Sequence, residues 1–103
     1  MNMREVVLRA IRNEAASTLT IRQIGILLVL YERRGGIGCG EFAALLGVHK
    51  PAITRNTDGL RDKGLLSKLA VKGDKRLVSI VISPLGEELL ESLGLVEAQR
   101  RAA

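Results

Sequence analysis

The stretch that decides the fold reads Glu41-Phe42-Ala43-Ala44-Leu45-Leu46-Gly47-Val48-His49-Lys50-Pro51-Ala52-Ile53-Thr54-Arg55. It predicts two helices around a tight turn, one over residues 41–46 and one over residues 50–63. Gly47 can take the left-handed conformation of a sharp helix end. Pro51 suits a first helical turn, where its missing amide hydrogen is not needed. This pattern indicates a helix-turn-helix.

Periodicity extends the prediction in both directions from this motif. Apolar residues at helical spacing predict helices over residues 3–16 and 21–33. Thr20 and Gln23 stand three residues apart at the start of the second of these helices, as in a capping box. After Gly64 the period changes to two over residues 66–71 and 77–82, which flank a Gly-Asp turn and predict a β-hairpin. A last helix is expected over residues 84–93, capped by Ser83.

The expected fold class is therefore mainly α with a small β-hairpin (α+β), a winged helix-turn-helix. The 103 residues are expected to form a single domain, residues 1–103. Apolar residues make up 47% of the chain and aromatic residues 2%, which predicts an aliphatic core. So few aromatic side chains argue against single-stranded nucleic acid bound by base stacking.

Cysteine usage and hydropathy restrict the location of the protein. The chain has one cysteine, Cys39, so no intrachain disulfide can form and a reduced, cytoplasmic protein is expected. The longest apolar run, residues 24–31, is far shorter than a membrane span. No membrane partner is therefore expected.

The net charge of +5 is concentrated in the middle of the chain. Eight basic and three acidic residues lie between Lys50 and Arg76, so this segment alone carries the whole net charge. Such a surface favours a polyanion, although a solvated helix and hairpin would show the same counts.

The predicted contact residues of the helix-turn-helix are His49, Lys50, Pro51, Thr54 and Arg55, at the exposed start of its second helix. Free amides at a helix N-terminus favour phosphate, and first-turn side chains can reach base edges in a major groove.

Neither catalysis nor a cofactor is indicated. One histidine and one cysteine cannot supply a typical structural zinc site, and no Ser–His–Asp order or phosphate-binding loop is present. Asp58 and Asp62 are interpreted as a solvated helical face. The sequence therefore predicts no enzyme, no catalytic residue and no metal site.

Three segments together resemble the MarR-type winged-helix family. They are residues 47–55, Asp58-Gly59-Leu60-Arg61-Asp62-Lys63-Gly64-Leu65-Leu66, and residues 74–78 followed by 82–90. The resemblance implies a bacterial, homodimeric transcriptional regulator that binds double-stranded DNA, expected to be a repressor acting on an inverted repeat. It places helix 50–63 in the major groove and a wing over residues 71–77 in the minor groove. The resemblance allows for a small-molecule effector, but no residue of the sequence indicates a binding site for one.

Within the wing, four residues are candidates for DNA binding: Lys72, Asp74, Lys75 and Arg76. The resemblance implies that Lys75 or Arg76 enters the minor groove and that Asp74 holds the arginine.

Two apolar stripes are candidate dimerisation elements, within residues 1–18 and 84–103. Their members are Val6, Val7, Ala10 and Ile11 in the first, and Leu89, Leu90 and Leu93 in the second. Alternatively, both stripes fold back onto the core of the monomer. Two other functions remain open at this point: a protein–protein interaction module, and a monomeric accessory DNA-binding factor of a mobile element.

Overall fold

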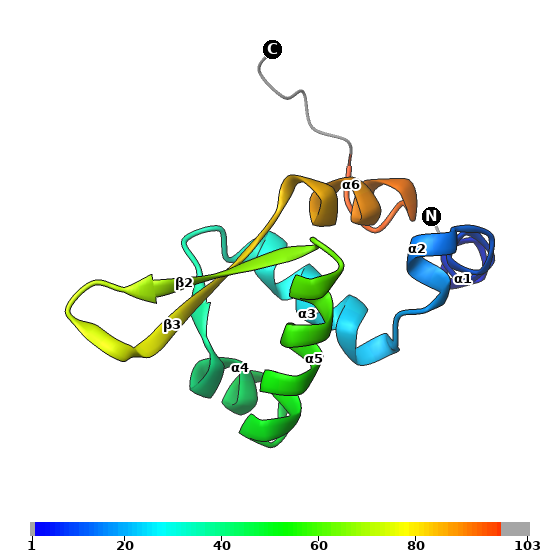
Figure 1. Cartoon of the computed structure of the whole chain (residues 1–103). Helices are drawn as coiled ribbons and strands as arrows, with labels where there is room; N and C mark the ends of the chain where they lie inside the picture. The colour runs from blue at the N-terminus through cyan, green and yellow to red at the C-terminus, as the bar shows by residue number, and fades with distance from the viewer. Residues whose placement is uncertain (1, 98–103) are drawn as a thin grey trace, which may run out of the picture.

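The computed structural model describes residues 2–97, and for residues 74–77 it describes the backbone alone. The elements of this range are α1 (Met3–Arg12), α2 (Glu14–Ser17), α3 (Ile21–Glu32), β1 (Ile37–Gly38), α4 (Cys39–Leu46), α5 (Lys50–Asp62), β2 (Leu66–Val71), β3 (Asp74–Ile82) and α6 (Pro84–Ser92). In Figure 1 the β2–β3 hairpin projects from one side of the helices and α1 lies on the opposite side. The predicted winged helix-turn-helix, mainly helical with a small sheet, is confirmed.

Two helices begin where their capping residues predict. The Thr20 side chain accepts a hydrogen bond from the amide of Gln23 at 3.1 Å, and the Gln23 side chain accepts one from the amide of Thr20 at 3.0 Å. These bonds form the capping box of α3. At the start of α6, Ser83 Oγ accepts from the amide of Gly86 at 3.1 Å. Local side-chain chemistry therefore fixes both starting points.

The single helix predicted over residues 3–16 is wrong, because the chain breaks at Asn13 into α1 and α2. The Asn13 side chain accepts a hydrogen bond from the amide of Ala16 at 3.1 Å and so caps α2. An asparagine side chain that bonds nearby backbone competes with helix continuation. Asn13 Nδ2 also donates to Ser92 Oγ of α6 at 3.1 Å. The break thus joins the N-terminal segment to the last helix.

The sheet has a third strand that the sequence did not predict. Its order is β1-β3-β2, with Ile37 opposite Ile80 and Gly38 opposite Ser79. Residues 37–38 are too few to show an alternating pattern. The strand exists because β3 offers a free edge beside the loop that leads into α4.

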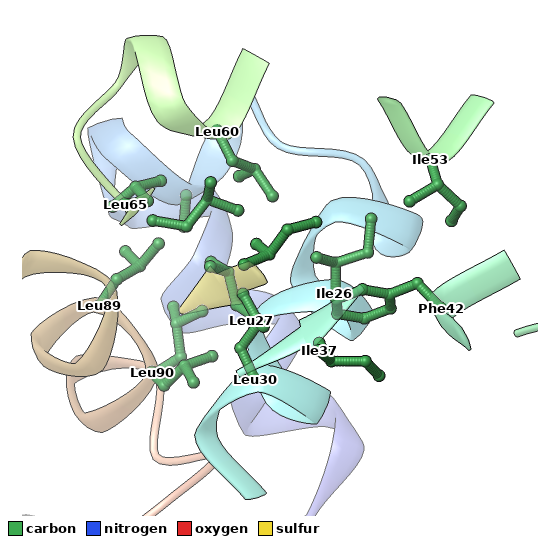
Figure 2. Close-up of a cluster of buried hydrophobic side chains, with 14 residues drawn as sticks. Ile26, Leu27, Leu30, Ile37, Phe42, Ile53, Leu60, Leu65, Leu89 and Leu90 are labelled. Atoms are coloured by element: carbon green, nitrogen blue, oxygen red, sulfur yellow. The ribbon is translucent and has the colours of Figure 1, made fainter. Parts of the chain in front are cut away.

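The core gathers around α3 and draws side chains from most of the other elements. Ile26, Leu27 and Leu30 of α3 are fully buried. Figure 2 shows them among other buried residues, which include Ile37, Phe42, Ile53, Leu60, Leu65, Leu89 and Leu90. One cluster of side chains, aliphatic apart from Phe42, therefore holds the helix-turn-helix, the sheet and α6 together.

This packing corrects the prediction that the second apolar stripe, at α6, is a dimerisation element. Leu89 is 5% exposed, and Leu90 and Leu93 are fully buried. All three belong to the core cluster. The apolar face of α6 therefore folds back onto the monomer, which was the alternative expected for both stripes.

Gly86 marks the closest approach of α6 to the rest of the domain. A Cβ at this position would overlap the carbonyl oxygen of Leu65 and lie 2.9 Å from Ile82 Cγ1. This oxygen belongs to the backbone, so it cannot move away without shifting the chain between α5 and β2. Only glycine fits without displacing either element.

We expect Gly86→Ala to destabilise the fold by about 1–3 kcal/mol, because the added methyl group forces backbone apart. The matched control is Gly40→Ala in α4, where a Cβ meets nothing within 4 Å. That variant should be neutral or gain about 0.5–1 kcal/mol from helix propensity. Urea unfolding followed by circular dichroism measures both. Equal stability of the two variants would contradict the close approach.

Candidate nucleic-acid interface

The turn between α4 and α5 has the geometry that its sequence predicts. Gly47 takes φ 64° and ψ 36°, in the left-handed region. The amide of Val48 donates to the carbonyl of Ala43 at 3.1 Å, which closes the end of α4. His49 is the extended N-cap residue of α5, and its side chain makes no capping hydrogen bond. Pro51 lies in the first turn, as expected.

One face of α5 anchors the helix in the core. Ile53, Thr57 and Leu60 are fully buried. The Thr57 hydroxyl is satisfied within the helix, because it donates to the carbonyl of Ile53 at 2.8 Å. A buried polar side chain bonded to its own helix leaves no unsatisfied group in the core. The rotation of α5 about its axis is therefore fixed.

The predicted contact residues lie together in solvent at the N-terminal end of α5. His49, Lys50, Pro51, Thr54 and Arg55 are all exposed. Lys50 and Arg55 form no ion pair with another described residue. The first two turns of α5 thus present two uncommitted positive charges and a hydroxyl group on a rigid helix.

A contact between Cys39 and Thr54 joins the two helices of the motif. Cys39 Sγ lies 3.4 Å from Thr54 Oγ1, and either atom can be the donor. Cys39 is a free, half-buried thiol at the first position of α4. The contact orients the Thr54 side chain on the exposed face. The sequence gives no signal for it, because the two residues are fifteen positions apart on different helices.

The hairpin supplies the second projecting element of this surface (Figure 1). Its strands are in register from Leu66 opposite Ile82 to Ala70 opposite Val78, and an irregularity follows between Ala70 and Val71. Lys72 lies at the turn, is exposed, and forms no ion pair with another described residue. The predicted contacts Asp74, Lys75 and Arg76 lie outside the described side chains.

A cleft of about 440 Å³ separates α5 from the hairpin. Lys50 and Thr54 line one side, Lys68 and Val78 line the other, and Cys39 belongs to the α4 end. The cleft is open to solvent beside the exposed half of α5. Basic and hydroxyl groups from two elements therefore converge on one space.

Lys68 is not free of ion pairs with described residues, unlike Lys50, Arg55 and Lys72. Its ammonium group donates to Asp58 Oδ1 of α5 at 2.6 Å, and its side chain is only 13% exposed. Arg61 Nη1 lies 3.4 Å from the same oxygen. The interpretation of Asp58 as part of a solvated face is thus incomplete, because this carboxylate connects the helix to the hairpin.

The electrostatic state of Asp58 follows from these contacts. The hydrogen bond from Lys68 lowers the pKa of the Asp58 carboxyl, burial opposes this effect, and the charges of Lys68 and Arg61 add to the lowering. The carboxylate is therefore ionised at neutral pH, and the ion pair persists there.

Other kinds of site find no support among the described residues. No group of three or more His, Cys, Asp or Glu side chains in that part of the chain is placed to hold a metal ion. None of its helices is long and apolar enough to cross a membrane.

The sequence of the chain is similar to those of known proteins. The family model of the MarR family matches residues 19–78. A relative, the uncharacterised HTH-type transcriptional regulator YpoP of Bacillus subtilis (strain 168), is 34% identical over 89 residues, which are 82% of this chain and 62% of the relative. The chain therefore spans less than two thirds of the length of that protein.

Solved structures share the fold. The transcriptional regulator Tm0710 of Thermotoga maritima has a TM-score of 0.72 and 29% identity, over 87% of this chain and 63% of its own. The S. aureus MepR–DNA complex has a TM-score of 0.77 at 20% identity, over 90% of this chain and 73% of its own, and shows likeness in fold. Both YpoP and Tm0710 are described as transcriptional regulators. Since the family model covers more than half of its residues, the chain belongs to the MarR family.

Proposed function

We propose that this protein is a sequence-specific regulator of transcription that binds double-stranded DNA. The observation that carries the proposal is the exposed first half of α5, where Lys50 and Arg55 are free of ion pairs with other described residues. A helix fits the major groove, and its N-terminal side chains reach the base edges. The DNA-bound state of MepR, which shares the fold, supports this partner.

The contact residues are assigned by their position on α5. Thr54 and Arg55 would read base edges, since an arginine fork matches the acceptors of guanine. His49, Lys50 and Pro51 lie at the N-terminus, where amides and charge favour phosphate. A helix held by buried side chains on its other face keeps these groups in place.

The hairpin would lie along the minor groove beside the major groove that α5 occupies. Lys72 at its turn would neutralise a phosphate. For Asp74, Lys75 and Arg76 we propose the roles that the resemblance implies, with a basic side chain in the groove and the carboxylate holding it. A dimer covering such a site would exclude polymerase, so we propose repression, in the bacterial cytoplasm.

The proposed assembly is a homodimer that forms through α1. No residue of α1 is buried, and its apolar stripe exposes Val7 by 47% and Ile11 by 65%. Together with Ile24 and Leu28 of α3, the stripe lines a groove of about 600 Å³. We propose that a second copy covers this groove, because exposed apolar surface of this kind marks interfaces. Two α5 helices would then face half-sites about 34–36 Å apart.

Salt dependence tests the DNA partner. If each subunit neutralises about four to six phosphates, the logarithm of the association constant should fall with the logarithm of salt concentration at a slope of roughly −4 to −5 per subunit. Fluorescence anisotropy with mixed-sequence duplex at several salt concentrations measures this slope. A slope near zero would reject DNA binding and favour a protein-docking module.

Two substitutions, Arg55→Ala and Lys72→Ala, test the proposal that the helix contacts bases and the wing contacts phosphate. The first should cost about 1–3 kcal/mol on a selected duplex and less on random duplex, because a base contact is lost. The second should weaken both duplexes alike, because a phosphate contact carries no sequence information. Equal losses for Arg55→Ala on the two duplexes would restrict Arg55 to phosphate.

Charge in the α1 stripe tests the dimer. Val7→Glu with Ile11→Glu should give a folded monomer with much weaker affinity for an inverted repeat, because neither residue belongs to the core. The matched control is Leu8→Glu, on the face of α1 that carries Arg4 and Arg9. Analytical ultracentrifugation measures the mass of each variant. A wild type that is monomeric at micromolar concentration would contradict the proposal.

A further inference from the structure

The Asp58–Lys68 pair is the shortest described link between α5 and the hairpin. Lys68 Nζ and Asp58 Oδ1 are 2.6 Å apart, and the lysine side chain is 13% exposed against 42% for the aspartate. Both atoms belong to elements already held by the core, since Leu60 of α5 and Leu66 of β2 are buried. An ion pair between two anchored elements loses little side-chain entropy on forming, unlike a pair on mobile surface chains.

The pair stands at the joint between the two proposed DNA-contacting elements. Asp58 follows Thr54 by four residues and Lys50 by eight, so the three share one face of α5. Lys68 lines the same cleft as Lys50 and Thr54. A change in the Asp58–Lys68 distance would therefore alter the angle between the helix and the hairpin.

The pair also removes a charge conflict. An unpaired carboxylate at this position would repel phosphates that approach Lys50 and the hairpin. The lysine neutralises it, and Arg61 adds a second positive group at 3.4 Å from the same oxygen. A fixed ion pair is close to neutral toward the backbone of a duplex.

We propose that Asp58 and Lys68 are positioning residues for DNA recognition, which set the angle between α5 and the wing and mask a carboxylate from the phosphates. This inference rests on the proposed function. Neither residue contacts DNA in this arrangement. The alternative is that Lys68 separates from Asp58 and binds a phosphate itself.

Four variants separate these roles: Lys68→Met, Lys68→Arg, Asp58→Asn and the double exchange Asp58→Lys with Lys68→Asp. Affinity is measured for a selected and a random duplex over a range of salt. Lys68→Met and Asp58→Asn should each lower the preference for the selected duplex roughly tenfold, as for residues in one network. Lys68→Arg and the double exchange should restore it to within about threefold, because both rebuild the pair.

A pH profile adds a readout that a purely structural role would not move. Without its lysine, the Asp58 carboxyl should have a higher pKa than in the wild type, because the hydrogen bond that lowers this pKa most is lost. As the pH is lowered, the affinity of Lys68→Met relative to wild type should therefore rise, because the Asp58 carboxylate of the variant is protonated before that of the wild type. The other charged or titratable groups around this cleft are Arg61, Lys50, Glu41, Cys39 and His49. They are common to both proteins, so the ratio isolates Asp58.

The outcomes are distinct. A salt slope reduced by about one in Lys68→Met, with equal losses on both duplexes, would make Lys68 a phosphate ligand and overturn the inference. Failure of Lys68→Arg and of the double exchange to restore preference, with thermal unfolding at the wild-type temperature, would overturn it as well. A wild type without salt-dependent duplex affinity would overturn the proposed function itself, and the inference with it.

Discussion

Everything at the candidate interface depends on the burial of one face of α5. Ile53 and Leu60 lie two turns apart on that face, with Thr57 between them, and none is accessible to solvent. Removing a buried leucine or isoleucine side chain typically costs about 2–5 kcal/mol, so rotation of the helix out of this seat is strongly opposed. Because this face is held in the core, the rest of the helix surface is turned toward solvent. The core packing of α5 is therefore enough to leave the polar residues at its start exposed to solvent.

Local chemistry made much of the fold predictable. The Thr20–Gln23 capping box, the left-handed Gly47 and the proline at position 51 are signals carried by neighbouring residues, and the structure contains all three. The features that escaped prediction need partners far along the chain. Strand β1 exists only as a complement to β3, and the inward turn of Leu90 depends on where α3 lies. The break at Asn13 had a local signal that the helical spacing of its neighbours outweighed.

The candidate site also combines features that follow from local sequence with features that depend on distant parts of the chain. The exposed start of α5 follows from the helix-turn-helix pattern, whereas the fate of each basic residue does not. Lys68 is bound to Asp58, and Lys63 donates to the Thr18 hydroxyl at 2.9 Å. A count of charges along residues 50–76 treats them as equal to Lys50 and Lys72. Only the fold separates the cations that hold the domain together from those that are free to meet a polyanion.

The hydrogen bonds of Asn13 have a consequence for the geometry of the proposed dimer. They fix the direction in which α1 leaves the domain, because the same side chain caps α2 and donates to Ser92 of α6. With a rise of 1.5 Å per residue, α1 acts as a lever roughly 15 Å long. A tilt of about 10° at Asn13 would move its far end by about 3 Å. If a second copy packs against α1, the spacing between the two recognition helices, and with it the span of DNA they match, depends on one amide group that lies outside the helix-turn-helix.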